Sequence, residues 1–288
     1  MVHSSLTLQE FFNSVYLRHH WLKDNSTKQI AVTLNLFDDW HGSPVLVASL
    51  SADLVLDFLR FRHRTKSART VNNNRAAIKA VWSFAHRKGH CSTPVPDSTD
   101  IPKLPEIKRL PTSWSIEELG RIIEACKSVR PLDGFDCRHW KALILVSFDT
   151  AHRLASLLAA KREDVSSLGF LIVRETKQKR ETVHKLHADT LKAIEELPRT
   201  PLLFPWPLCE HAIHDELKSL LRSANLPATR RDLFQKLRRT SATHLAAVCG
   251  ESAAERHLDH RTPGLASRSY IDRRFMPQIH AADVLPRP

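Results

Sequence analysis

Apolar residues recur at spacings of three and four through roughly the first ninety positions of the chain. The spacing is clear from Leu8 to Tyr16 and again from Leu54 to Leu59. Such spacing places apolar side chains on one face of an α-helix. We therefore predict an all-helical domain over residues 1–90.

The segment from Thr70 to Arg87 has the most telling helical pattern in this domain. Its apolar residues fall within a sector of about 100° on a helical wheel; they are Val71, Ile78, Val81, Trp82 and Ala85. A polar stripe lies beside them, formed by Asn72, Arg75, Lys79 and His86. This stripe is either an ordinary solvated face or a face for an acidic partner.

The periodicity stops at Cys91, and the composition changes to Ser, Thr, Asp and proline. The prolines of this stretch are Pro94, Pro96, Pro102, Pro105 and Pro111. A proline-rich segment without apolar periodicity is typical of a linker, which we place at 91–112. A second domain, 113–288, then begins with a capping box at Ser115 and Glu118 and a helix through Ala125.

The second domain contains both helical and strand-like patterns of apolar residues. Residues 140–151 are apolar nearly all round a helix, which predicts a buried helix. Residues 170–173 and 182–186 read as two strands flanking the polar run 177–180, and helices are expected from Asp189 to about Ala282. The predicted fold is mainly α, with two domains and a small β-hairpin in an otherwise helical second domain.

Charge narrows the choice of partner. The chain of 288 residues carries 43 Lys and Arg against 31 Asp and Glu, a basic balance that favours a polyanion. Nucleic acid is therefore the leading partner, and Asn72, Arg75 and Lys79 are candidate DNA-binding residues. Only 7 glycines occur, and none forms a phosphate-cradling loop, so we expect no nucleotide cofactor.

The cysteines and the hydropathy bear on location. The cysteines are odd in number and never paired as CxxC, which is typical of free thiols in a reducing compartment. The residues after Met1 lack the apolar run of a signal peptide, and no stretch approaches the ~18 apolar residues of a membrane span. We expect a soluble, cytoplasmic protein with no membrane partner.

Four basic residues and one tyrosine of the second domain stand out when read in order. They are Arg153 at the end of the buried helix, Lys177 at the hairpin turn, Arg238 in Leu237-Arg238-Arg239-Thr240, His260 in Leu258-Asp259-His260, and Tyr270 in Arg268-Ser269-Tyr270-Ile271-Asp272. In this order and context they resemble the tyrosine recombinase (phage integrase) family. The likeness covers the whole chain in layout and is specific in the last 140 residues or so.

The resemblance implies a role for each of these residues. Arg153 and Arg238 would bind the scissile phosphate, and Lys177 would protonate the leaving oxygen, with Lys179 an alternative at the same turn. His260 would be the late active-site histidine and Tyr270 the nucleophile. Asp164 falls where the family commonly has an acidic residue. The resemblance also implies a SAM-like core-binding domain followed by a catalytic domain, which act on double-stranded DNA as a homotetramer on paired sites of a mobile element.

The chemistry explains why such residues are needed. Displacing one bridging oxygen of a phosphodiester builds negative charge on the non-bridging oxygens, and fixed guanidinium groups bind that charge bidentately. A tyrosine hydroxyl is a weak nucleophile until it loses its proton. The 3′-phosphotyrosine then keeps the bond energy, so a 5′-hydroxyl can reverse the step without ATP or a metal.

Three departures from the family pattern bear on activity. Gln235 stands where the family most often has a histidine, Ser156 where it usually has Glu, and Asp259 where it usually has Gly. Glutamine can donate a hydrogen bond to a phosphate oxygen but cannot carry a proton. Proton transfer would then fall to His260 or Lys177, with slower cleavage expected.

Rival interpretations follow from these departures and from the 17 histidines. A non-cleaving DNA-binding protein of the same fold is the main alternative, and a monomeric topoisomerase is a weaker one. A zinc site is a further rival, built from Cys209, His211 and His214 with His184 and His187 or with His257 and His260. We expect no metal.

Overall fold

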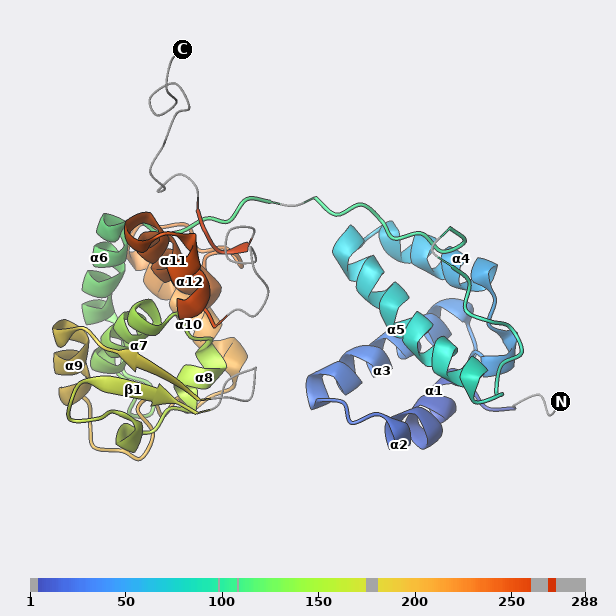
Figure 1. Ribbon diagram of the computed structural model, residues 1–288, viewed down its shortest axis with the longest axis horizontal. Helices are drawn as coiled ribbons and strands as arrows, with labels where there is room; N and C mark the ends of the chain where they lie inside the picture. Colours follow the sequence, from blue (N-terminus) through green and yellow to red (C-terminus); the bar gives the residue numbers. More distant parts are fainter. Residues whose placement is uncertain (1–4, 98, 108, 175–180, 260–268, 273–288) are drawn as a thin grey trace, which may run out of the picture. The chain divides into compact units, whose positions relative to one another are not determined.

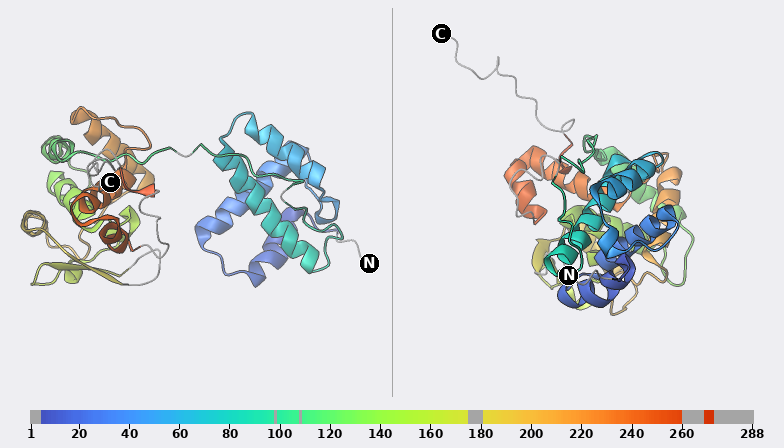
Figure 2. Two further views of the ribbon diagram at one scale, coloured as in Figure 1. Left: turned by 45° about the horizontal axis from the view of Figure 1, so that its top comes forward. Right: turned by 90° about the vertical axis from the view of Figure 1, so that its right-hand side faces the viewer.

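The computed structural model describes residues 5–97, 99–107, 109–174, 181–259 and 269–272. The chain divides into two compact units, the N-terminal unit of residues 1–108 and the C-terminal unit of residues 109–288. Each unit has its own apolar core, and each is described here by itself. Figures 1 and 2 show the two units in three views.

The described part of the N-terminal unit is helical. Its elements are α1 (Leu8–Phe11), a π-helical turn (Phe12–Tyr16), α2 (Leu17–His19), α3 (Asp24–His41), a 3₁₀ turn (Val47–Ser49), α4 (Ala52–His63) and α5 (Ala68–Arg87). Helix α5 contacts both α3 and α4 (Figure 1). The predicted helix over residues 70–87 is confirmed, and its apolar residues Val71, Ile78, Val81 and Trp82 are buried in the core.

The polar stripe of α5 holds the chain that follows it. Asn72 donates to the carbonyl of Leu104 at 3.0 Å and accepts from its amide at 2.9 Å. Further along the helix, Arg75 donates to Ile101 O, Lys79 to Pro96 O and Trp82 to Thr93 O, at 2.7, 2.7 and 2.9 Å. The segment 91–106 therefore runs back along α5, antiparallel to it.

This packing changes the interpretation of the segment predicted to be a linker. Cys91 and Ile101 are buried in the core of the N-terminal unit, so residues 91–106 belong to that unit in packing. The polar groups of Asn72, Arg75 and Lys79 are engaged with this segment, and their contact with DNA stays a prediction.

The C-terminal unit is mainly helical, with one small sheet among its described residues. Its helices are α6 (Ile116–Ala125), α7 (Cys137–Thr150), α8 (Leu154–Leu158), α9 (Ala188–Glu195), α10 (Glu210–Ser223), α11 (Phe234–Cys249) and α12 (Glu251–His257), with 3₁₀ turns at Cys126–Ser128 and Arg162–Asp164. Strands β1 (Phe170–Val173) and β2 (Thr182–Lys185) pair antiparallel, with Phe170 opposite Lys185. The predicted fold class and both strands are confirmed.

Helix α7 organises the C-terminal unit. It contacts α8, α9, α11 and β2, and its residues Ala142, Leu143, Ile144 and Val146 are fully buried, as its sequence predicted. Helices α11 and α12 pack side by side (Figure 1). The predicted capping box is present, since Ser115 and Glu118 bond each other's backbone amides at the start of α6. No helix in the described part of the chain is long and apolar enough to cross a membrane.

Candidate active site

Arg238 occupies the centre of the candidate site. It lies on the second turn of α11 with 2% of its surface exposed. Its guanidinium donates through Nη1 to the carbonyl of Ala151 and through Nη2 to the carbonyl of Leu258 at 2.8 Å. Its Nε is buried with no hydrogen-bond partner among the described residues. Two backbone carbonyls therefore hold the guanidinium, and its Nε remains a buried donor.

Two tight turns present those carbonyls. Ala151 ends α7 in the left-handed region, with φ of 51°, and Asp259 follows Leu258 with φ of 55°. The left-handed conformation costs a non-glycine residue about 1–2 kcal/mol, and Asp tolerates it better than most. The geometry explains why a glycine would suit position 259, where sequence analysis noted a departure.

The first turn places Arg153 beside this centre. Arg153 is the N-cap residue of α8, two residues after Ala151, and is partly buried. Its charge is one cause, after burial, of the lowered pKa of Arg238. Arg153 therefore lies close enough to influence Arg238, 85 positions further along the chain, electrostatically.

Tyr270 lies against the same guanidinium. The centre of its ring is 5.4 Å from Cζ of Arg238, within the range of a cation–π contact. Its carbonyl accepts from Oγ1 of Thr243 on α11 at 3.2 Å. The structure thus brings three of the predicted site residues, Arg153, Arg238 and Tyr270, into one place.

The charge of Arg238 persists at neutral pH. Burial and the neighbouring charge of Arg153 lower its pKa to about 10, while Tyr270 acts in the opposite direction. At pH 7 the guanidinium remains protonated. The site therefore offers a fixed positive charge that needs no reorganisation to meet an anion.

Three histidines that sequence analysis did not group meet beside Arg238. Nε2 of His152 lies 2.9 Å from Nε2 of His184 and 2.9 Å from Oγ1 of Thr182. The ring of His184 is 5.5 Å from the ring of His257, whose Nε2 lies 2.9 Å from Oγ of Ser241. They come from the α7–α8 turn, strand β2 and helix α12, so no local pattern connects them.

These histidines are neutral at pH 7. Burial, followed by the charges of neighbouring groups, lowers the pKa of His152 to about 3. The pKa values of His184 and His257 fall to about 4, again through burial first and then through charges that include Arg238. A neutral imidazole accepts or relays a proton but adds no positive charge to the site.

The base of the hairpin is held on both sides of its turn. Asp164, 2% exposed, accepts from Nε of Arg174 at 2.6 Å, and Arg174 also donates to Glu181 at 2.9 Å. Arg174 and Glu181 are the last and first described residues around the turn. Asp164 thereby holds Arg174, the residue that directly follows β1.

The remaining predicted residues divide into two groups. Lys177, Lys179 and His260 lie outside the described residues. Gln235 is exposed on the first turn of α11, three residues before Arg238, and Ser156 is buried in α8.

The rival zinc site finds no support in the described part of the chain. No group of three or more His, Cys, Asp or Glu residues there is arranged to hold a metal ion. In particular, His152 and His184 approach each other as hydrogen-bond partners, and the third histidine, His257, is paired with Ser241.

Comparison with known proteins identifies the fold. No protein-family model matches the chain, and no curated protein matches it. Several solved structures do match the chain. A lambda integrase tetramer bound to a Holliday junction has a TM-score of 0.76 at 17% identity, over 97% of this chain and 82% of that one.

Two further solved structures, one of an integrase and one of a recombinase, are also similar to this chain. The Tn1549 transposon integrase (residues 82–397) with circular intermediate DNA has a TM-score of 0.71 at 14% identity, over 98% of this chain and 100% of that one. The XerH site-specific recombinase bound to a palindromic difH substrate has a TM-score of 0.64 at 18% identity, over 83% and 74%. This chain has the tyrosine recombinase fold.

Proposed function

We propose that this protein breaks and rejoins DNA strands through a covalent link to Tyr270, as a site-specific recombinase or integrase. One observation carries the proposal. Arg238, held by two backbone carbonyls, lies against the ring of Tyr270, and the charge of Arg153 contributes to lowering the pKa of Arg238. Two arginines beside a tyrosine supply a phosphate-binding charge and a nucleophile in one place.

The proposed step is a transesterification at a backbone phosphate. The Tyr270 oxygen attacks phosphorus, a new P–O bond forms, and the bond to the 5′-oxygen breaks. The tyrosine gives up its proton, and the leaving 5′-oxygen takes one, so the step is balanced without an external reagent. The reverse attack by a 5′-hydroxyl rejoins a strand and frees Tyr270.

Each residue of the proposed site has one task. Arg153 and Arg238 stabilise the charge on the non-bridging oxygens, and the unpaired Nε of Arg238 is a donor left for one of them. We assign Lys177 to protonation of the leaving oxygen and His260 to proton transfer. Gln235 contributes a neutral hydrogen bond to the phosphate.

Double-stranded DNA is the proposed partner, with a homotetramer assembled on paired sites. The net charge of +12 supports a polyanionic partner. The structural neighbours include a tetramer on a Holliday junction. In the N-terminal unit, the end of α4 offers exposed Arg64 and Lys66, which are better placed for phosphate contact than the engaged stripe of α5.

A second candidate function is DNA binding without cleavage. The exposed Gln235 stands on the α11 turn that leads to Arg238 and cannot transfer a proton. A site that keeps its arginines but lacks an acid–base group still binds a phosphate.

The test is covalent trapping on a nicked suicide substrate, in which the cleaved fragment diffuses away and the protein stays attached. Wild type should form the complex and Tyr270→Phe should not, at closely similar DNA affinity, because only the nucleophilic oxygen is removed. Attachment by Tyr270→Phe would overturn the assignment of the nucleophile. Bound DNA without attachment by wild type would favour the second function.

A further inference from the structure

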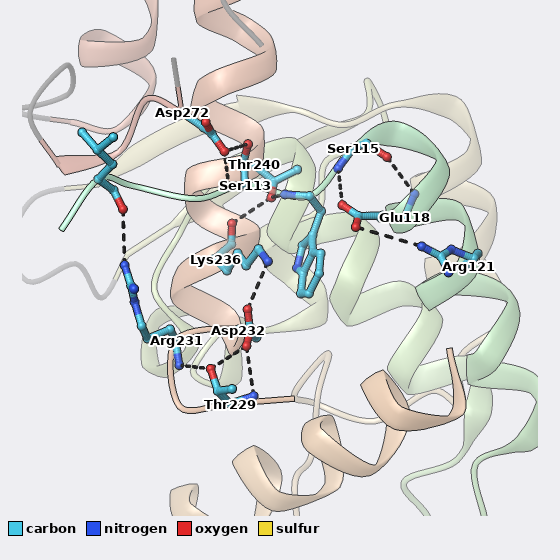
Figure 3. Close-up of polar contacts among 12 residues, drawn as sticks. Ser113, Ser115, Glu118, Arg121, Thr229, Arg231, Asp232, Lys236, Thr240 and Asp272 are labelled. Carbon is cyan, nitrogen blue, oxygen red and sulfur yellow. Dashed lines mark hydrogen bonds and ion pairs between the residues drawn. The ribbon is translucent and has the colours of Figure 1, made fainter. Parts of the chain in front are cut away.

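The segment that bears Tyr270 is bonded to the start of the C-terminal unit. Asp272, two residues after the tyrosine and 2% exposed, accepts through Oδ2 from the amide of Ser113 at 2.8 Å and from its hydroxyl at 3.2 Å. Figure 3 shows this pair between Ser113 and Asp272. Ser113 is also 2% exposed, so both hydrogen bonds are shielded from water.

The same two segments are bonded to α11, the helix that carries Arg238. On the tyrosine side, Asp272 N donates to Oγ1 of Thr243 at 2.9 Å, and Thr243 donates to Tyr270 O. On the other side, Trp114 N donates to Oγ1 of Thr240 at 2.9 Å. A buried acceptor or donor that loses its partner costs about 1–3 kcal/mol, so these bonds tie both segments to one helix.

We propose that Asp272 is a positioning residue, whose carboxylate fastens the Tyr270 segment to Ser113, where the chain arrives from the N-terminal unit. This inference rests on the proposed role of Tyr270. In-line attack tolerates little error in the place of the nucleophile. The Ser113–Asp272 pair sets that place and couples it to the chain entering the C-terminal unit.

The proposed role of Asp272 concerns the position of Tyr270 and not the affinity for DNA. Asp272 is bonded to Ser113 and to Thr243, and neither of these residues is assigned to phosphate binding. Its loss should therefore slow attack at saturating DNA while leaving affinity in place. A merely structural role would lower stability without this division.

The chain offers a matched control at Asp232. This aspartate is also buried, at 7% exposure, and also accepts from both the amide and the hydroxyl of one residue, Thr229, besides pairing with Lys236 at 3.0 Å (Figure 3). Asp232→Ala removes a comparable set of hydrogen bonds just before the start of α11. It controls for general loss of packing.

The experiment compares single-turnover attachment to a suicide substrate for wild type, Asp272→Ala, Asp272→Asn and Asp232→Ala, each at saturating DNA. Asp272→Ala should be slower by about ten- to a hundredfold, with Kd changed by no more than about twofold. Asp272→Asn, whose amide oxygen still accepts from Ser113, should recover most of the rate. Asp232→Ala should lower the melting temperature more than the rate.

A second measurement does not depend on cleavage. Amide hydrogen exchange at Ser113 should be faster in Asp272→Ala than in wild type and unchanged in Asp232→Ala. Wild-type rate and wild-type exchange in folded Asp272→Ala would overturn the inference while leaving the proposed function intact. Faster exchange at Ser113 with no attachment by wild type would instead place the failure in the proposed function.

Discussion

The ring of Tyr270 lies with its centre 5.4 Å from the guanidinium carbon of Arg238, although 32 positions separate the two residues along the chain. The contact joins a candidate nucleophile to a buried charge that α11 and two backbone carbonyls hold in place. In the proposed reaction, a fixed charge at this point would stabilise the anion formed during attack without reorganisation.

Arg238→Lys should damage both stability and attachment. A lysine ammonium on its single stem does not reproduce a planar fork that reaches Ala151 and Leu258 together. Leaving one buried carbonyl unpaired should lower the free energy of unfolding by about 1–3 kcal/mol, measured by urea denaturation. Arg239→Lys, on the same helix but more exposed, is the control. Equal stability of wild type and Arg238→Lys would contradict the anchoring role.

DNA binding should depend on salt in a way that locates the phosphate contacts. If about ten phosphates are neutralised, the slope of log affinity against log salt is about −9. Replacing exposed Arg64 and Lys66 with Ala should reduce its size by about 1.8, because each lost phosphate contact removes about 0.9. The slope is measured by titration at several salt concentrations.

The double substitution of Arg64 and Lys66 is compared with a second one, Arg75→Ala together with Lys79→Ala. These side chains donate to carbonyls of the segment 96–101, so the pair should lower stability more than the salt slope. The opposite outcome, a reduced slope at unchanged stability, would place the DNA on α5 as the sequence first indicated.

The α5 stripe shows where prediction from sequence ends. Periodicity predicted the helix and its buried face correctly, because both depend on spacing along one element. It did not predict that residues 91–106 fold back onto the stripe, because this depends on which carbonyls pair with Arg75 and Lys79. A proline-rich composition looks the same in a free linker and in a segment bonded to a helix.

The candidate site shows the same limit. The order of Arg153, Arg238 and Tyr270 predicted a site, and the structure brings the three together. Nothing local to His152, His184 or His257 predicted that they meet, since each depends on the turn after α7, the hairpin register and the end of α12. The bond between Ser113 and Asp272 spans 159 positions and has no sequence signature.

The lowered pKa values of the three histidines predict how the free energy of unfolding depends on pH. Their folded pKa values of about 3 to 4 lie below the ordinary value near 6.5. Their stabilising contribution is therefore complete above pH 6.5 and is lost as the pH falls towards 3, because the unfolded chain binds the protons first. Each histidine adds a slope of up to about 1.4 kcal/mol per pH unit in that window.

The measurement is the free energy of unfolding from pH 7.5 to pH 4. His152→Leu should flatten the slope, since leucine takes up no proton. The control is the same substitution at an exposed position, His63→Leu. A His152→Leu slope equal to that of wild type would mean that other groups cause the acid sensitivity.

Gln235 separates an enzyme from a binding protein with the same fold. It stands exposed one helical turn before Arg238, so a larger or charged side chain fits there without repacking the core. In an active site, Gln235→His replaces one neutral hydrogen bond to the phosphate with a group that can also carry a proton. Cleavage should then be retained or increased by up to about tenfold, the effect of 1.4 kcal/mol.

The decisive comparison is single-turnover cleavage by wild type, Gln235→His and Arg153→Ala on the same suicide substrate, with DNA binding verified for each. Cleavage by the first two and none by the third identifies an enzyme whose arginines supply most of the transition-state stabilisation. In a binding relic, restoring one group would not rebuild a site whose members act non-additively. Absence of covalent product from all three, on DNA that is bound, would therefore establish a DNA-binding protein that has lost cleavage.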